Sequence, residues 1–103
     1  MLNNRKRRPT HPGAVLAEIL PSSAVKNQAN LARLMGVSRR LVNEIINERR
    51  PVTVSVAHRL AAVFNTTPDV WLNMQVAVDI WDDAERNRAK YEEIRHRAAE
   101  LAA

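Results

Sequence analysis

Hydrophobic residues recur every three or four positions along most of the chain, and no stretch sustains an alternation of apolar and polar residues. This spacing is typical of helices that bury one face. Together with the capping and breaking residues between the apolar runs, it predicts five helices. They are expected at residues 12–20, 28–35, 39–47, 54–64 and 68–81. The pattern therefore indicates an all-α fold, with a compact five-helix domain over residues 11–81.

Residues that suit helix ends stand at the boundaries of these segments. Pro12 and Pro68 lie where a first-turn proline loses no hydrogen bond, and Ser38, Thr53 and Thr67 are N-cap residues. The inward faces supply the candidate core, which comprises Val15, Leu16, Ile19, Leu20, Leu31, Leu34, Met35, Leu41, Val42, Ile45, Ile46, Val56, Leu60, Val63, Phe64 and Trp71.

Residues 28–47 carry the most specific pattern in the chain. Two short helices joined by a few residues that include glycine form a helix-turn-helix. The helices cross steeply and need a small residue at the crossing, which Ala32 provides, while Gly36 tolerates the left-handed backbone of the turn. Val42 and Ile45 would fix the second helix from its inner side. These features together predict a DNA-binding helix-turn-helix; without them an αα-hairpin of no particular function would be expected.

The outer face of the second of these helices is expected to read DNA, because the start of a recognition helix enters the major groove. Arginine suits guanine and asparagine suits adenine. The base-contacting candidates are Ser38, Arg39, Arg40 and Asn43. The phosphate-contacting candidates are Gln28, Asn47, Arg49 and Arg50. Glu44 would repel phosphate, so it is expected to point away or to read a cytosine.

Both ends of the chain differ from the domain between them. Residues 1–10 have no apolar anchor beyond Leu2, which predicts a flexible basic arm carrying Arg5, Lys6, Arg7 and Arg8. Such an arm either enters the minor groove or adds salt-dependent affinity, and the second role is favoured. Residues 82–103 are predicted to form a charged helical extension, with a break or restart of the helix near Asp82 and Asp83.

The last helix of the predicted domain carries more apolar surface than one small domain can cover. Trp71 is assigned to the core, whereas Met74, Val78 and Trp81 are expected to contact a second copy of the chain. A twofold dimer would double the DNA contact and read two half-sites.

Charge divides the chain in two. Residues 1–50 carry ten Lys and Arg against three Glu, residues 51–103 carry six against eight Asp and Glu, and the total is +5. The basic half suggests a face that binds a polyanion. Cysteine is absent, the three histidines are isolated and no Gly-rich phosphate loop is present, so no metal, cofactor or enzymatic activity is expected. No membrane span or signal peptide is visible, which predicts a cytoplasmic, nucleoid-associated protein.

Several stretches resemble the HigA antitoxins, which are also described as VapI-like or plasmid-maintenance antidotes, within the XRE-type, lambda-repressor-like family. They are His11-Pro12-Gly13, the run from Leu31 to Ser38, Arg50-Pro51-Val52-Thr53, Ala57-His58-Arg59-Leu60-Ala61, and the more specific Pro68-Asp69-Val70-Trp71-Leu72-Asn73-Met74-Gln75. Where the family often has Glu, Gly and Gly, this chain has Ala14, Glu48 and Asn65. Asn65 tolerates the left-handed conformation, and Asn47 could serve in place of the missing glycine beside it.

The resemblance implies a lambda-repressor-like fold and an antitoxin that binds a palindromic operator in its own promoter as a homodimer. It also implies neutralisation of a cognate toxin of RelE/HigB type, a ribosome-dependent mRNA endonuclease. Two alternatives stay open: a stand-alone XRE-family repressor with no toxin partner, and an interaction adaptor whose helix-turn-helix no longer binds DNA. The extension would serve the toxin, the dimer or neither.

Overall fold

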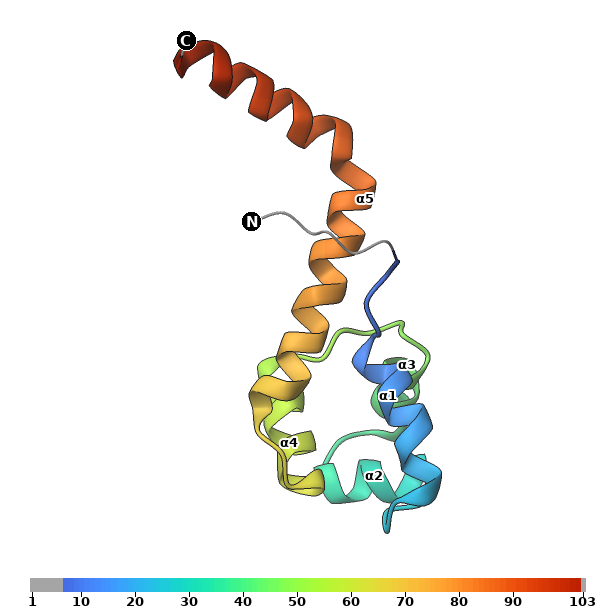
Figure 1. Cartoon of the computed structure of the whole chain (residues 1–103). Helices are drawn as coiled ribbons and strands as arrows, with labels where there is room; N and C mark the ends of the chain where they lie inside the picture. The colour runs from blue at the N-terminus through green and yellow to red at the C-terminus, as the bar shows by residue number, and fades with distance from the viewer. Residues whose placement is uncertain (1–6, 103) are drawn as a thin grey trace.

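The computed structural model describes residues 7–102, and most of this part is helical (Figure 1). The elements are α1 (Pro12–Ile19), the short 3-10 helix η1 (Leu20–Ser22), α2 (Gln28–Met35), α3 (Arg39–Ile46), α4 (Val54–Phe64) and α5 (Pro68–Ala102). No strand occurs within residues 7–102. The prediction of an all-α fold with five α-helices is confirmed.

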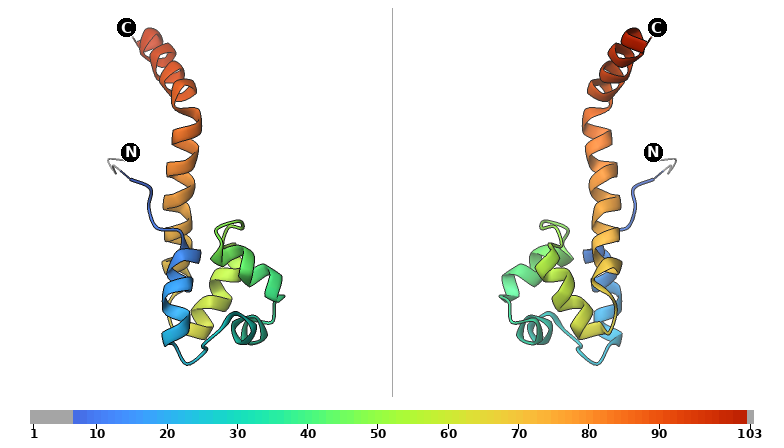
Figure 2. Two further views of the ribbon diagram at one scale, coloured as in Figure 1. Left: turned by 90° about the vertical axis from the view of Figure 1, so that its right-hand side faces the viewer. Right: turned by 90° about the vertical axis from the view of Figure 1, so that its left-hand side faces the viewer.

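A small body holds α1 to α4 and the first turns of α5, and the rest of α5 projects from it (Figures 1 and 2). α3 packs against α1 and α2, α2 also packs against α4, and α5 packs against α4 and α1. In the side views of Figure 2, α3 lies across the body from α5. The described chain measures 59 Å along its longest axis and 22 and 20 Å across it, so the projecting helix dominates the shape.

Side-chain caps explain where three of the helices begin. Asn27 Oδ1 accepts a hydrogen bond from the Asn30 amide at 2.9 Å and starts α2. Ser38 Oγ accepts from the Leu41 amide at 3.1 Å and starts α3, as the sequence predicts. Thr53 Oγ1 does the same for α4, so each helix satisfies one of its unpaired first-turn amides.

Left-handed residues follow α2, α3 and α4. Gly36 (φ 71°) ends α2 and Asn65 (φ 54°) ends α4, which confirms both predictions. After α3, however, the left-handed residue is Glu48 (φ 61°), and Asn47 keeps a negative φ of −87°. The suggestion that Asn47 replaces the missing glycine is therefore wrong by one position.

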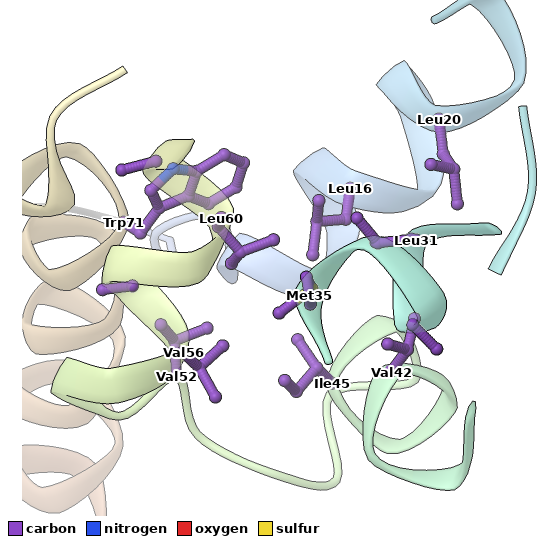
Figure 3. Packing of buried hydrophobic residues seen from close by; sticks show 13 residues of the cluster. Leu16, Leu20, Leu31, Met35, Val42, Ile45, Val52, Val56, Leu60 and Trp71 are labelled. Atoms are coloured by element: carbon purple, nitrogen blue, oxygen red, sulfur yellow. The ribbon is translucent and has the colours of Figure 1, made fainter. Parts of the chain in front are cut away.

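The core lies between the four helices of the body and the base of α5 (Figure 3). Leu16, Leu31, Ile45 and Leu60 are fully buried there. Leu34 is the exception among the predicted core residues, because 60% of its surface is exposed. It lies on the edge of α2, where it borders an open groove between α2 and α4 instead of entering the core.

Trp71 closes the core from α5, as predicted. Its ring lies 6.0 Å from that of Phe64, and its indole Nε1 donates a hydrogen bond to Thr66 Oγ1 at 2.9 Å. Trp71 is therefore buried with its one polar atom paired.

The backbones of α1 and α3 come together at Gly13. A Cβ atom at this residue would lie 1.8 Å from the carbonyl oxygen of Ile45, in the last turn of α3. The amide of Gly13 donates to Nδ1 of the buried His11 at 2.9 Å, so the histidine caps α1. The His-Pro-Gly motif thus serves to start α1 and to let α3 approach it.

α5 continues through Asp82 and Asp83, so the predicted break there is wrong. The helix changes direction at Asn87, whose φ and ψ are −121° and 21°. The side-chain Nδ2 of Asn87 donates to the Asp83 carbonyl and carboxylate at 3.2 and 2.9 Å, and the Tyr91 hydroxyl donates to the same carboxylate. These contacts stabilise the bend at Asn87, and they engage the carboxylate of Asp83, one of the two residues at which the sequence predicts a break.

Replacing Gly13 by alanine should destabilise the protein more than replacing Gly36, because the added methyl meets backbone and not a movable side chain. We expect Gly13→Ala to cost at least about 2 kcal/mol, against about 1–2 kcal/mol for left-handed strain alone in Gly36→Ala. Urea denaturation followed by circular dichroism measures both. Equal losses, or a smaller loss for Gly13→Ala, would contradict the proposed contact.

Stability should fall on acidification because of His11. Burial is the main cause that lowers the pKa of His11 below its ordinary value of 6.5, and its Nδ1 can accept the Gly13 hydrogen bond only when unprotonated. The unfolded chain therefore protonates His11 more readily than the folded protein does. The contribution of neutral His11 to the free energy of unfolding is present above pH 6.5 and is lost as the pH falls through the lowered pKa of the folded state. His11→Asn, which keeps a capping oxygen but does not titrate, should lose less stability between pH 7.5 and 5.5. The exposed His58→Gln is the control and should follow the wild type.

Candidate nucleic-acid interface

The outward face of α3 is polar because its inward face is fixed in the core. Val42 and Ile45 are buried, and between and before them Arg39, Arg40 and Asn43 are exposed. The base-contacting candidates therefore share one solvent-facing surface at the start of the helix, where a recognition helix meets base edges. Ser38 stands directly before them, with its oxygen engaged as the cap.

The amino end of α2 lies beside the middle of α3. Nδ2 of Asn43 donates a hydrogen bond to Oε1 of Gln28 at 3.2 Å, which joins a predicted base contact to a predicted phosphate contact. Gln28 is the first residue of α2, and a helix amino terminus attracts anions. A groove of about 320 Å³ runs from Gln28 to Arg39 and is also lined by Lys26.

Lys26 is a basic residue of this surface that the sequence interpretation missed. It is exposed, has a left-handed backbone (φ 79°) and precedes the cap of α2 by one residue. A lysine next to an N-cap at the start of the first helix of a helix-turn-helix is the signal that could have identified it.

The loop after α3 carries the remaining candidates. Asn47 Nδ2 donates to the Asn43 carbonyl at 2.9 Å, and Arg49 is exposed. Arg50 pairs with Glu44 at 2.7 Å, and Arg40 approaches the same carboxylate at 3.5 Å. The hydrogen bond from Arg50 is the main cause that lowers the pKa of Glu44. Glu44 therefore stays charged and holds two of the predicted DNA-contacting arginines.

One long-range contact holds this loop in place, and a second holds the end of α2. Oε1 of the buried Gln75 in α5 accepts from the Val52 amide at 2.9 Å, while its Nε2 donates to Asp79 at 2.9 Å. The guanidinium of Arg59 donates to the Met35 carbonyl at 2.5 Å and closes the end of α2. Residues of α4 and α5 thus hold the candidate DNA face in position from inside the fold.

Arg8 is not part of a free arm, contrary to the sequence prediction. It pairs through Nε and Nη2 with the Asp82 carboxylate at 2.8 and 3.0 Å and through Nη1 with Glu48 at 2.7 Å. These contacts lower the pKa of Asp82, and Pro9 behind Arg8 is buried. Arg7 is exposed, and Arg5 and Lys6 lie outside the described residues.

The three residues predicted to contact a second copy have different environments. Val78 is 1% exposed inside the chain's own fold, so it offers no surface to a partner, which corrects that assignment. It borders the pocket between α5 and the loop after α3, together with His11 and Pro51. Met74 and Trp81 are partly buried, and the exposed apolar residues nearby are Val76 and Ile80.

Comparison with known proteins assigns the family. A helix-turn-helix family model matches residues 26–71. The chain is 42% identical over 92 residues to antitoxin HigA-1 of Vibrio cholerae, covering 88% of this chain and 84% of the relative. The chain belongs to the HigA antitoxin family. It is also 45% identical over 89 residues to the HTH-type transcriptional regulator YbaQ of Escherichia coli K12, covering 85% of this chain and 77% of the relative.

A solved HigA structure shares the fold of this HigA-family chain. Antitoxin HigA of Pseudomonas aeruginosa, determined with the higBA promoter, superposes with a TM-score of 0.77 and is 31% identical, covering 84% of this chain and 94% of that one. HigA relatives are DNA-binding antitoxins and regulators, so the expectation of a non-enzymatic protein is confirmed by family. Over residues 7–102 no helix is long and apolar enough to span a membrane.

The motif from Pro68 to Gln75 that carries the HigA resemblance has a structural explanation in this chain. Trp71 fills the core, and Gln75 ties the loop after α3 to α5. Neither residue lies on the exposed face of α3. The motif therefore supports the fold that positions the interface, while the exposed residues of α3 would determine which ligand binds.

Proposed function

We propose that this HigA-family chain is an antitoxin that binds operator DNA in its own promoter as a homodimer, represses its operon and neutralises a RelE-like mRNA-cleaving toxin. The observation that carries the DNA-binding part is the shared surface of Arg39, Arg40 and Asn43 on α3 with Gln28 at the amino end of α2. The presence of the higBA promoter in the P. aeruginosa HigA structure supports the choice of an operator as the ligand.

The proposed roles follow from position on the surface. Arg39 and Arg40 stand at the start of α3 and suit guanine, and Asn43, oriented by Gln28, suits adenine. Ser38 keeps its hydroxyl proton for a further hydrogen bond, because the cap uses only the oxygen as acceptor.

Phosphate contacts are proposed at the edges of the same surface. Gln28 and Asn47 flank Asn43, Arg49 adds positive charge on the loop, and Arg50 beside it is proposed to contact phosphate from its pairing with Glu44. Arg5, Lys6 and Arg7 would add salt-dependent affinity through released counterions. Arg8 is excluded from this set, since Asp82 and Glu48 already neutralise it.

A homodimer is proposed through the part of α5 that precedes the bend at Asn87. Val76 and Ile80 are exposed and lie one turn apart, and the partly buried Trp81 follows Ile80 directly. A second copy packed there would cover this apolar strip and place two α3 helices on two half-sites.

A stand-alone repressor is the second candidate, and the similarity to the transcriptional regulator YbaQ of E. coli favours it. Both candidates use the same DNA face. They differ in whether a small toxin, encoded beside this chain's gene, binds the protein.

Replacing Arg39 and Arg40 together by alanine should weaken binding to the chain's own promoter DNA by about 2–5 kcal/mol. This corresponds to a rise in Kd of about 30-fold to several thousand-fold. Fluorescence anisotropy with a labelled promoter fragment at fixed salt measures the change. Arg86→Ala with Lys90→Ala removes the same charge from α5 and should change the Kd by less than about threefold. Equal losses in the two variants would indicate that only net charge matters, and no loss in either would favour the adaptor.

A further inference from the structure

Glu44 is an acidic side chain on a surface that is proposed to bind a polyanion. It lies on α3 directly after Asn43 and one turn after Arg40, and its side chain is 25% exposed. A carboxylate at this place repels the phosphates of DNA, because both groups are negatively charged. The sequence leaves open whether Glu44 points away from DNA or reads a cytosine. The contacts of its two carboxylate oxygens favour a different role.

Each carboxylate oxygen of Glu44 faces a different arginine. Oε1 accepts hydrogen bonds from Nε and Nη2 of Arg50 at 3.0 and 2.7 Å. Oε2 lies 3.5 Å from Nε of Arg40, which is an ion pair longer than an ordinary hydrogen bond. Glu44 therefore fixes Arg50 but only attracts Arg40, whose side chain is 84% exposed and stays available to a base edge.

Arg50 is held so that its remaining donors can serve a phosphate. Arginine has five N–H donors in a planar fork, and the two at Nη1 lie outside the bonds to Glu44. The backbone supports the same geometry, because the Arg49 amide donates to the Glu44 carbonyl at 2.8 Å and turns the loop back onto α3. Arg50 is thus ordered in the free protein, and less side-chain entropy is lost when it meets a phosphate.

This arrangement affects two kinds of DNA in opposite ways. Binding without sequence preference depends on how many cations neutralise phosphates, and Glu44 cancels one positive charge of the face. A DNA site with a phosphate beside the fixed guanidinium gains a contact while the ion pair of Glu44 and Arg50 stays intact. Other DNA must either separate this pair or forgo the contact, so the pair disfavours it.

We propose that Glu44 is a specificity-determining residue, which positions Arg50 for one operator phosphate and weakens binding to all other DNA. The inference rests on the proposed operator function and adds to it the source of discrimination. Glu44 acts here as a positioning residue, because it works through Arg50 and through its own charge without contact to a base.

Two labelled DNA fragments of equal length test the proposal with the full-length protein: the chain's own promoter and a scrambled sequence of the same composition. Fluorescence anisotropy at several salt concentrations gives both Kd values. Glu44→Gln should lower the Kd for the scrambled fragment about five- to tenfold, since an arginine is freed for phosphate. The Kd for the promoter should change by less than about twofold, because the gain in charge is offset by the loss of the ordered Arg50.

The salt dependence gives a second readout that a change in folding alone would not produce. Freeing Arg50 adds about one released counterion, so the slope of log Kd against log salt for the scrambled fragment should steepen by about 0.9 in Glu44→Gln. When Arg50→Ala is already present, Glu44→Gln should change the ratio of the two Kd values less than it does in the wild-type chain.

Glu93→Gln is the matched control. Glu93 pairs with Arg97 at 2.7 Å, the same distance as between Glu44 and Arg50, but it lies beyond the bend of α5, away from α3 (Figure 1). The substitution removes the same charge and also frees one arginine. It should change either Kd by less than about twofold, because charges this far from the DNA face are screened by salt.

An unchanged ratio of the two Kd values in Glu44→Gln would overturn the proposal, and an equal change in Glu93→Gln would assign the effect to net charge. Promoter fragments that each carry one substituted base pair test the alternative of direct reading. If Glu44→Gln relaxed the preference at one base pair and left the scrambled Kd unchanged, Glu44 would read a base instead. If the wild-type chain did not prefer its own promoter, the proposed operator function would fail as well. Circular dichroism confirms that each variant keeps its helix content.

Discussion

The position of α3 depends on one contact between backbones, at Gly13 of α1 and Ile45 of α3. Only a residue without a Cβ lets the two helices approach so closely. Because Ile45 and Val42 then enter the core, the opposite face of α3 is left to solvent, and Arg39, Arg40 and Asn43 stand on it. The exposure of the polar side chains of α3 is therefore a consequence of the close packing of its inner face against the core.

The loop that leaves α3 is tied to α5 by a polar and an ionic connection. Gln75 satisfies the Val52 amide from inside the fold, and Arg8 joins Glu48 to Asp82 on its surface. Exposed ion pairs contribute little singly, but a guanidinium shared by two carboxylates fixes three segments at once. The DNA-facing loop and the base of α5 thus form one unit, so a dimer formed through α5 would carry a fixed arrangement of both α3 helices.

Most of the fold could be predicted because its signals are local. Ser38 and Thr53 fix helix starts through their side-chain oxygens and Gly36 fixes a helix end through its backbone, and the apolar spacing assigns most of the core. The errors at Arg8, Val78 and Leu34 come from the packing of residues that are distant in sequence. The partners of Arg8 are 40 and 74 residues away, the burial of Val78 depends on the packing of its helix against the body, and Leu34 falls at an edge that periodicity alone does not resolve. Likewise, the candidate DNA-contacting residues could be found from exposure on one helix, whereas the pairing of Asn43 with Gln28 requires the crossing of two helices.

We propose that one face of the body binds DNA while the protein also binds a toxin. Affinity purification of the tagged full-length protein from its native host, at moderate salt and followed by mass spectrometry, tests it most directly. We expect a small protein encoded beside this gene to co-purify in stoichiometric amount. Recovery of the homodimer alone, or of DNA alone, would contradict the antitoxin function and leave a stand-alone repressor.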